Sequence, residues 1–313
     1  MKNTKILLTG GAGYIGSMLS TYLVNNDYDL TVLDNFMYSQ SSLNHLCDKQ
    51  NFNIINGDVR NENLLKNLIK QHDIIIPLAA YVGAPLCNSD PVGSKSVNYD
   101  SIKMMLSNVS NDQIILMPTT NSAYGSGEKN NYCDESSQLN PISSYAKDKV
   151  EVEKMLMDRP NSVSFRLATV FGMSYRMRLD LLVNDFTYRA VKDKFLILFE
   201  SHFKRNYIHV RDVVNVFIFA LNNFQKMKNQ IFNVGLSNAN ISKYELCLAI
   251  KKNIDDFYFT EASIGKDIDQ RNYIVSNKKI ENYGFLPLYD LDFGIKELIK
   301  GYQMLNESKY RNI

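Results

Sequence analysis

The hydrophobic positions in the first half of the chain follow two alternating patterns, short apolar runs and stretches with helical spacing. The apolar runs predict buried strands at residues 6–8, 30–33, 52–55, 73–78, 113–117 and 163–167. The helical spacing lies between them, at residues 14–25, 43–48, 61–70, 97–109 and 145–159. Strands that alternate with helices form a parallel sheet covered on both faces. We therefore predict an α/β fold, a Rossmann-type doubly wound parallel sheet with its ligand crevice at the carboxyl ends of the strands.

The regular alternation ends after residue 167. Helices are then predicted at residues 179–191, 211–224, 243–252 and 291–309, and strands at residues 204–208 and 231–234. We expect two domains. The first, at residues 1–167, is a dinucleotide-binding domain, and the second, at residues 168–313, is a smaller mixed α/β lobe that binds substrate.

The composition excludes several classes of function. Of the 313 residues 45% are hydrophobic and 22% are charged, and the net charge of +2 gives no reason to expect nucleic acid or a membrane surface as a partner. No apolar run reaches the roughly 20 residues that cross a bilayer. The first strand begins close to the N-terminus, so no signal peptide is predicted. The four cysteines and four histidines are scattered, which favours a reduced, cytoplasmic protein without a metal site.

Three glycines, Gly10, Gly13 and Gly16, connect the first strand to the first helix with the spacing GxxGxxG. A strand, a tight glycine turn and a helix N-terminus form a site for a pyrophosphate, because the backbone can approach the ligand and free amides face its charge. Asp34 ends the next strand, 18 residues after Gly16. A carboxylate there accepts hydrogen bonds from the adenosine ribose and repels a 2′-phosphate. The combination predicts NAD as the cofactor rather than NADP.

Further cofactor contacts are expected where the other strands end. Asp58 could reach the adenine amino group or cap the helix at residues 61–70, and these two roles are compatible. The small residues after the fourth strand would let a dinucleotide lie against the strand end. The predicted cofactor-binding residues are Gly10, Gly13, Tyr14, Ile15, Gly16, Asp34, Asn35, Asp58, Val59, Leu78, Ala79, Ala80, Tyr145 and Lys149.

Tyr145 and Lys149 stand four residues apart at the start of a predicted helix, so both lie on one face. A tyrosine that acts as a base near pH 7 needs a pKa about three units below its usual 10. A nearby ammonium and an oxidised nicotinamide ring both favour the phenolate. A YxxxK match can arise by chance in a chain with 19 tyrosines. The glycine turn, Asp34 and a strand-end threonine give it weight, because they occur in the order that such a site requires.

These stretches resemble the extended short-chain dehydrogenase/reductase family, in particular its nucleotide-sugar epimerases, dehydratases and dehydrogenases. The matching segments are residues 9–16, 57–58, 78–80, 120–125, 145–149 and 205–212. The resemblance implies that Tyr145 is the base and that Lys149 holds the nicotinamide ribose. It also implies that Thr120, four residues before a Tyr-Gly pair, binds the reacting hydroxyl, with Thr119 as an alternative.

The resemblance also implies a binding site for a nucleotide-diphosphate sugar. The expected substrate contacts are Thr120, Asn121, Asn184, Arg205 and Arg271. Arginine suits a phosphate because its planar fork forms paired charge-assisted hydrogen bonds. A plain surface position is the alternative for Arg205 and Arg271. Arg176 and Arg178, after the sixth strand, could reach the sugar or lie in a solvated loop.

The expected chemistry is hydride transfer from C4 of the sugar to NAD. Dehydratases of this family carry Asp-Glu after the active threonine, whereas Asn121 and Ser122 stand here, so dehydration is not expected. Two outcomes stay open. A 4-epimerase returns the hydride to the other face of the keto sugar. A 4-dehydrogenase releases the keto sugar, and a keto acid such as 2-oxoglutarate then reoxidises the tightly bound NADH.

Oxidation is the main expectation for two reasons. The segment Leu167-Ala168-Thr169 departs from the aromatic-Asn pattern of many epimerases. The whole sequence is also most similar to enzymes that oxidise GDP-D-glycero-α-D-manno-heptose in capsular polysaccharide biosynthesis.

The other expected partner is a second copy of the chain in a homo-oligomer, a dimer or tetramer. A non-catalytic dinucleotide sensor is a hypothesis of another class, and the presence of Thr120 and the YxxxK pair disfavours it.

Overall fold

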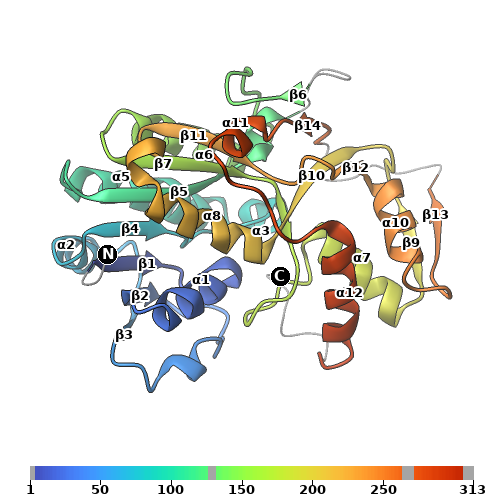
Figure 1. Cartoon of the computed structure of the whole chain (residues 1–313), viewed down its shortest axis with the longest axis horizontal. Coiled ribbons are helices and arrows are strands. Elements are labelled where there is room, and N and C mark those ends of the chain that lie inside the picture. The colour runs from blue at the N-terminus through green and yellow to red at the C-terminus, as the bar shows by residue number, and fades with distance from the viewer. Residues whose placement is uncertain (1–3, 126–131, 263–270, 306–313) are drawn as a thin grey trace.

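The computed structural model describes residues 4–125, 132–262 and 271–305 of the chain. Its centre is a seven-stranded parallel sheet in the order β11-β7-β5-β4-β1-β2-β3 (Figure 1). The strands of this sheet are β1 (Lys5–Thr9), β2 (Asp29–Asp34), β3 (Phe52–Asn56), β4 (Ile74–Pro77), β5 (Ile114–Thr120), β7 (Ser162–Leu167) and β11 (Gln230–Val234).

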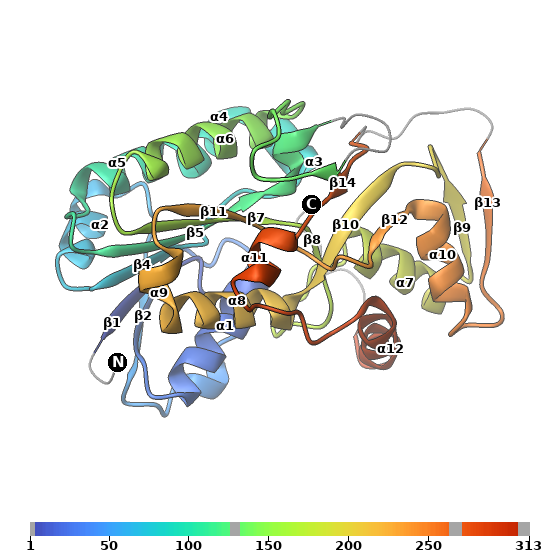
Figure 2. The same ribbon diagram turned by 45° about the horizontal axis from the view of Figure 1, so that its top comes forward.

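Helices cover both faces of this sheet (Figure 2). One layer holds α2 (Glu62–Ile69), α5 (Ser101–Asn108) and α6 (Ser144–Met157), and the other holds α1 (Tyr14–Asn25) and α8 (Val210–Asn222). Side chains of β1 alternate between the layers, because Leu7 packs in the core on the α2 side whereas Ile6 and Leu8 pack on the α1 side. Such alternation is expected of a strand that is buried on both faces. The prediction of a doubly wound α/β fold is confirmed.

The predicted elements differ from the observed ones mainly at their ends. The helix expected at residues 97–109 begins earlier, as α4 (Pro91–Lys95), and runs through a π-helical turn (Ser96–Asp100) into α5. It begins there because the Asp90 side chain accepts a 2.8 Å hydrogen bond from the Gly93 amide and caps the first turn. Residues 43–48 form only a short 3₁₀ turn, η1 (Asn44–Leu46). The first helix, α1, has the bounds that the hydrophobic pattern predicts.

Smaller sheets lie beside the large one, in the orders β12-β10-β8, β13-β9 and β14-β6. The remaining elements are α3 (Ala84–Ser89), η3 (Asn121–Tyr124), β6 (Tyr132–Cys133), β8 (Thr169–Phe171), α7 (Leu182–Lys192), β9 (Phe195–Leu198), β10 (Lys204–His209), α9 (Phe224–Met227), β12 (Asn240–Ser242), α10 (Lys243–Lys251), β13 (Tyr258–Glu261), β14 (Ile274–Val275), α11 (Lys278–Asn282) and α12 (Leu291–Tyr302). The helix expected at residues 291–309 thus ends sooner, and residues 306–309 lie outside the described residues. None of the described helices is long and apolar enough to cross a membrane.

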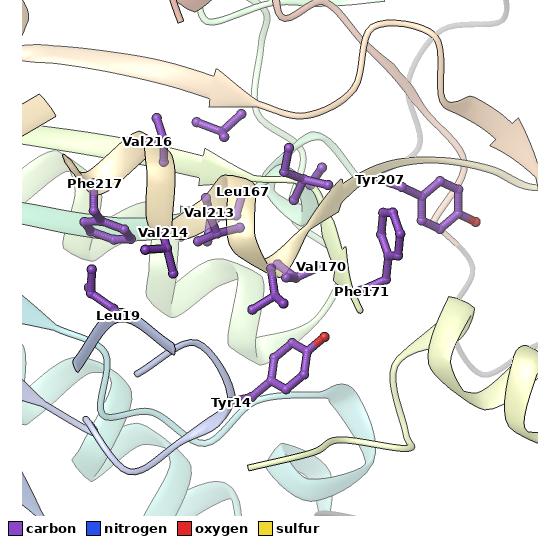
Figure 3. Packing of buried hydrophobic residues seen from close by; sticks show 14 of the residues in the cluster. Tyr14, Leu19, Leu167, Val170, Phe171, Tyr207, Val213, Val214, Val216 and Phe217 are labelled. Carbon is purple, nitrogen blue, oxygen red and sulfur yellow. The ribbon is translucent and has the colours of Figure 1, made fainter. Parts of the chain in front are cut away.

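Strands from before and after residue 167 belong to the large sheet. β11 pairs in parallel with β7, with Gln230 opposite Val163, and α8 packs against α1. Figure 3 shows the resulting core, in which Leu19 of α1 and Phe217 of α8 belong to the same cluster as Phe171 of β8. The hydrophobic core is therefore continuous from the large sheet into the second lobe.

Candidate active site

The glycine turn after β1 forms a cradle for a ligand. Gly10 has a φ of +70°, and a Cβ there would lie 2.5 Å from the backbone nitrogen of Ala79. Gly16 lies so close to the carbonyl oxygen of Gly10 that a side chain does not fit. Gly13 is the N-cap of α1, and in the described part of the chain no side chain caps this first turn. The backbone amides of Tyr14, Ile15 and Gly16 there suit the negative charge of a pyrophosphate.

Asp34 ends β2 beside this turn and is 8% exposed. Its carboxylate accepts hydrogen bonds from the backbone amides of Ala12 at 3.0 Å and Phe36 at 2.9 Å. Burial raises the pKa of Asp34 above its ordinary value, and these two hydrogen bonds oppose that shift. The protein thus fixes the orientation of the carboxylate at the position where the sequence predicts an adenosine ribose.

A pocket opens at the carboxyl ends of the central strands, as predicted for the fold. The predicted cofactor residues that line it are Gly10, Gly13, Asp34, Asn35, Asp58, Val59, Leu78, Ala79 and Ala80. Tyr38 and Tyr81 also line it, and no sequence motif marked either of them. The glycine turn has no room for side chains at Gly10 and Gly16, and the pocket lies beside it. Together they fit a dinucleotide.

Asp58 does not cap the helix that follows it. Its carboxylate binds the Arg60 side chain at 2.6 and 2.8 Å, and these hydrogen bonds lower the pKa of Asp58 to about 2. The cap of α2 is Asn61, which accepts a hydrogen bond from the Leu64 amide at 3.1 Å. The capping alternative for Asp58 is therefore wrong, and its place in the pocket leaves the adenine role open.

A hydrogen bond connects the side chains of Tyr14 on α1 and Asn184 on α7. The Tyr14 hydroxyl donates to the Gly172 carbonyl at 2.6 Å and accepts from Asn184 Nδ2 at 3.3 Å. Asn184 also donates to the Arg178 carbonyl at 2.9 Å, and its Oδ1 accepts from the Gly172 amide at 3.0 Å. Asn184 is fully buried. This arrangement does not support the prediction that Asn184 contacts a diphosphate, and it leaves only the backbone of Tyr14 for the cofactor.

The YxxxK pair lies at the start of α6, which Ser143 caps by accepting a hydrogen bond from the Ala146 amide at 3.2 Å. Burial raises the pKa of Tyr145 to about 12, while the positive charges of Arg178 and Arg271 oppose the shift. Burial lowers the pKa of Lys149 to about 8. Lys149 is 4% exposed, and its ammonium group has no hydrogen bond or ion pair with any described residue. The unpaired, buried ammonium fits a site for ligand hydroxyls.

The two threonines at the end of β5 point in opposite directions. The Thr119 hydroxyl donates to Glu153 Oε2 at 2.9 Å, next to the buried ion pair of Glu153 with Arg166, in which Nη2 and Oε1 are 2.6 Å apart. The Thr120 hydroxyl instead accepts from the Ser122 amide at 3.1 Å and donates to Ser122 Oγ at 3.0 Å. Since alternate residues of a strand face opposite sides, only Thr120 lies on the side of η3.

Ser122 connects Thr120 to the second lobe, because its Oγ also accepts a hydrogen bond from Arg271 Nη1. Arg271 is close enough to Tyr145 to influence its pKa. Hydrogen bonds through Ser122 therefore link Thr120 to Arg271, a cation whose charge acts on Tyr145. No sequence motif marked Ser122 as a link between Thr120 and Arg271.

The remaining predicted substrate residues are buried. Arg205 is 2% exposed and its guanidinium lies 5.7 Å above the ring of Tyr273, so the surface alternative is wrong for this residue. Asn121 is fully buried, and neither polar atom of its amide has a hydrogen-bond partner in the described parts of the chain. Arg176 and Arg178 are 4% and 8% exposed, which excludes a solvated loop for both.

A family model described as "NAD dependent epimerase/dehydratase family" matches residues 6–235. The chain belongs to this family. It is an NAD-dependent enzyme of the nucleotide-sugar epimerase/dehydratase type, as the resemblance of its motifs implied.

Relatives of known name cover nearly the whole chain. The CDP-paratose 2-epimerase of Salmonella typhi is 28% identical, over 89% of this chain and 93% of that protein. Two solved structures share the fold. One is the UDP-glucose 4-epimerase of Thermus thermophilus in complex with NAD, with a TM-score of 0.82, 20% identity and coverage of 96% of this chain and 99% of the other. The second is the UDP-glucuronic acid 4-epimerase of Bacillus cereus in complex with UDP-glucuronic acid and NAD, with a TM-score of 0.84, 21% identity and coverage of 97% and 100%.

Proposed function

We propose that this protein is a nucleotide-sugar 4-epimerase that keeps its cofactor through the catalytic cycle. The observation that carries the proposal is the segment after β5. We assign Thr120 as the partner of Tyr145 at the reacting hydroxyl, and the next two positions hold Asn121 and Ser122, which are neither acids nor bases near neutral pH. This set can remove and restore one hydroxyl proton, which is what an epimerisation at a single carbinol carbon requires. The epimerases among its relatives support the same reaction.

NAD, when bound, would supply the acceptor and donor of the hydride. The residues of the chain do the remaining work. Tyr145 takes the proton of the C4 hydroxyl and later returns it, and Thr120 binds that oxygen. The pKa of about 12 that burial gives Tyr145 must fall for this task. The charges of Arg178 and Arg271 already act on that value, so the further fall depends on Lys149 and on the positive nicotinamide ring that oxidised NAD would bring.

The cofactor contacts follow from the pocket. The backbone of Gly10, Gly13 and the first turn of α1 binds the pyrophosphate, and Asp34 accepts hydrogen bonds from the adenosine ribose. Lys149 donates to the nicotinamide ribose with its unpaired ammonium. On the substrate side, Arg205 and Arg271 bind the sugar diphosphate.

The second candidate is a GDP-D-glycero-α-D-manno-heptose 4-dehydrogenase of capsule biosynthesis, with a keto acid such as 2-oxoglutarate as co-substrate. The segment Leu167-Ala168-Thr169 favours it, because the aromatic-Asn pair of many epimerases is missing there. Ala168 sits between β7 and β8, with its amide donating to the Val234 carbonyl at 2.9 Å. For either reaction we expect a homo-oligomer.

Product analysis tests the proposal. Purified protein is incubated separately with UDP-, GDP- and CDP-linked hexoses and with GDP-manno-heptose, each with and without 2-oxoglutarate. We expect a C4 epimer of one nucleotide sugar to form without any keto acid. A 4-keto product that accumulates only in the presence of 2-oxoglutarate would replace this proposal with the dehydrogenase. The Tyr145→Phe variant serves as the control for chemistry by contaminating enzymes.

A further inference from the structure

The loop between β8 and α7, residues 172–181, fastens the second lobe to the first turn of α1 (Figures 1 and 2). The Ser174 hydroxyl donates to the Tyr14 carbonyl at 2.6 Å, and the Tyr14 hydroxyl donates to the Gly172 carbonyl at 2.6 Å. The Arg176 amide donates to Ser17 Oγ at 3.3 Å. The loop therefore lies beside the helix end whose amides suit a pyrophosphate.

Arg178 of this loop presents one free edge of its guanidinium. Its Nε and Nη2 donate to the two carboxylate oxygens of Asp180 at 3.2 and 2.5 Å. No described residue accepts a hydrogen bond from its Nη1. Nη2 lies 3.8 Å from the position that a Cβ of Gly83 would take, in the segment that follows β4. Asp180 thus fixes the plane of a guanidinium that retains a donor for a ligand.

Arg176 adds a second buried cation. Its guanidinium lies 4.3 Å above the ring centroid of Tyr38, and Tyr38 lines the cofactor pocket. Its Nη2 is buried and has no hydrogen-bond partner among the residues that the structure describes. Burial and the nearby charge of Arg178 lower the pKa of Arg176. The charges of Asp180 and Asp34 act on Arg176 in the opposite direction, but among the described residues neither carboxylate forms an ion pair with it. A buried charge without a direct partner is costly unless an anion neutralises it.

The position of Arg178 indicates which anion would bind at these two arginines. Arg178 is close enough to Tyr38, in the adenosine pocket, and to Tyr145, at the catalytic end, to shift the pKa of both. The pyrophosphate of NAD joins the adenosine and nicotinamide halves and carries two negative charges. We propose that Arg178, held by Asp180, binds the pyrophosphate of NAD from the second lobe, with Arg176 adding positive charge above Tyr38.

This contact has a consequence for cofactor release. The first turn of α1 binds the pyrophosphate on one side and Arg178 binds it on the other, so NAD leaves only when residues 172–181 lift. The hydrogen bonds of Tyr14 and Asn184 hold this loop down. The inference concerns the NAD site alone, and it stands whether the net reaction is epimerisation or oxidation.

Binding to cofactor-free protein tests the inference by calorimetry. Arg178→Met removes the charge, and Arg178→Lys keeps the charge but not the planar fork. Arg189→Met is the matched control, because Arg189 lies on α7 with 41% of its side chain exposed, in a surface ion pair with Asp185. We expect Arg178→Met to weaken NAD and ADP-ribose by about 10- to 100-fold, the worth of one charged hydrogen bond. Arg178→Lys should lose less, and adenosine should bind all variants equally.

Each other outcome overturns the assignment. Unchanged affinity for NAD and ADP-ribose in folded Arg178→Met would remove the contact. An equal loss for adenosine would show that Arg178 only supports the pocket. Titration of NAD-loaded protein with UDP, GDP or CDP separates the two sources of diphosphate, because a loss confined to these ligands would assign Arg178 to the substrate. If the methionine variant does not fold, the lysine variant answers the same questions through its smaller effect.

Discussion

The two halves of the active site are built in different ways. On the cofactor side the pocket is formed by strand ends and backbone, with Gly10 and Gly13 at the turn and Asp34 fixed by neighbouring amides. On the proposed substrate side, long polar side chains converge from segments far apart in the chain, as Arg271 does when it binds Ser122. Substitutions should therefore damage the first half through steric fit and the second through a lost charge or hydrogen bond.

Tyr145 is the proposed catalytic base, and its substitution should have the largest effect. Tyr145→Phe removes the proton acceptor and should lower kcat by about 10²- to 10⁴-fold, the usual contribution of general acid–base catalysis. NAD affinity should stay within a factor of two, because Lys149 and the glycine turn are intact. Steady-state kinetics and calorimetry measure the two quantities. A large loss of NAD affinity would mean that Tyr145 belongs to the cofactor side only.

The buried ammonium of Lys149 should make the stability of the fold depend on pH. Its pKa falls from the ordinary 10.5 to about 8 in the fold, so the unfolded chain holds this proton to higher pH. The buried ammonium therefore destabilises the fold below pH 8. This destabilisation disappears as the pH rises from 8 to 10.5, because Lys149 loses its proton in the folded chain first. Lys149→Met should abolish activity yet raise the free energy of unfolding of cofactor-free protein at pH 7 by up to about 3 kcal/mol.

Urea unfolding at several pH values checks this expectation. The gain in stability should shrink as the pH rises from 8 to 10.5. Lys147→Met, at an exposed position of the same helix, is the control and should change stability little at any pH. A loss of stability in Lys149→Met would contradict the account of an ammonium kept for the ligand.

The steric fit on the cofactor side can be broken at a single carbon. Gly10→Ala would place a Cβ 2.5 Å from the Ala79 nitrogen at a φ of +70°, so it should cost about 1–3 kcal/mol of stability and weaken NAD. At Gly13 the nearest atom to an added Cβ is 3.1 Å away and φ is −78°, so Gly13→Ala should lose less. Thermal unfolding with and without NAD compares the two, and equal losses would contradict the cradle.

The threonine pair separates structure from chemistry. Thr119→Val removes a donor to the buried Glu153 and should lower stability by about 1–3 kcal/mol, with kcat near that of the wild type. Thr120→Val should leave stability nearly unchanged and lower kcat by about 10- to 100-fold, as for one hydrogen bond made in the transition state. Measuring unfolding and kcat for both variants tests the opposite directions of the two side chains, and reversed effects would exchange their roles.

The cofactor side could be predicted because short segments specify it. Gly10 to Gly16 form the turn through their own backbone, and the spacing of apolar residues gave α1 its bounds. Asp34 follows from the end of an apolar strand. Each of these features depends on neighbours within a few residues, so the local pattern is sufficient.

The other half depends on packing between distant segments, which no local pattern contains. Asn184 was expected to meet substrate, but tertiary contacts place it among Tyr14, Gly172 and Arg178. From the sequence, Arg178 was expected only to reach the sugar or to lie in a solvated loop, because its ion pair with Asp180 and its burial depend on the packing of the loop. The strand β11 also joined the large sheet from beyond residue 167, because an apolar run does not specify the sheet in which it pairs.

The fate of the hydrogen at C4 tests the central claim most directly. The nucleotide sugar that the enzyme turns over is prepared with deuterium at C4 and incubated without any keto acid. A 4-epimerase that keeps its cofactor returns the label, so mass spectrometry and NMR should find deuterium at C4 of the epimerised product. Loss of the label from the product, or its appearance in 2-hydroxyglutarate when 2-oxoglutarate is added, would contradict the internal return of hydride.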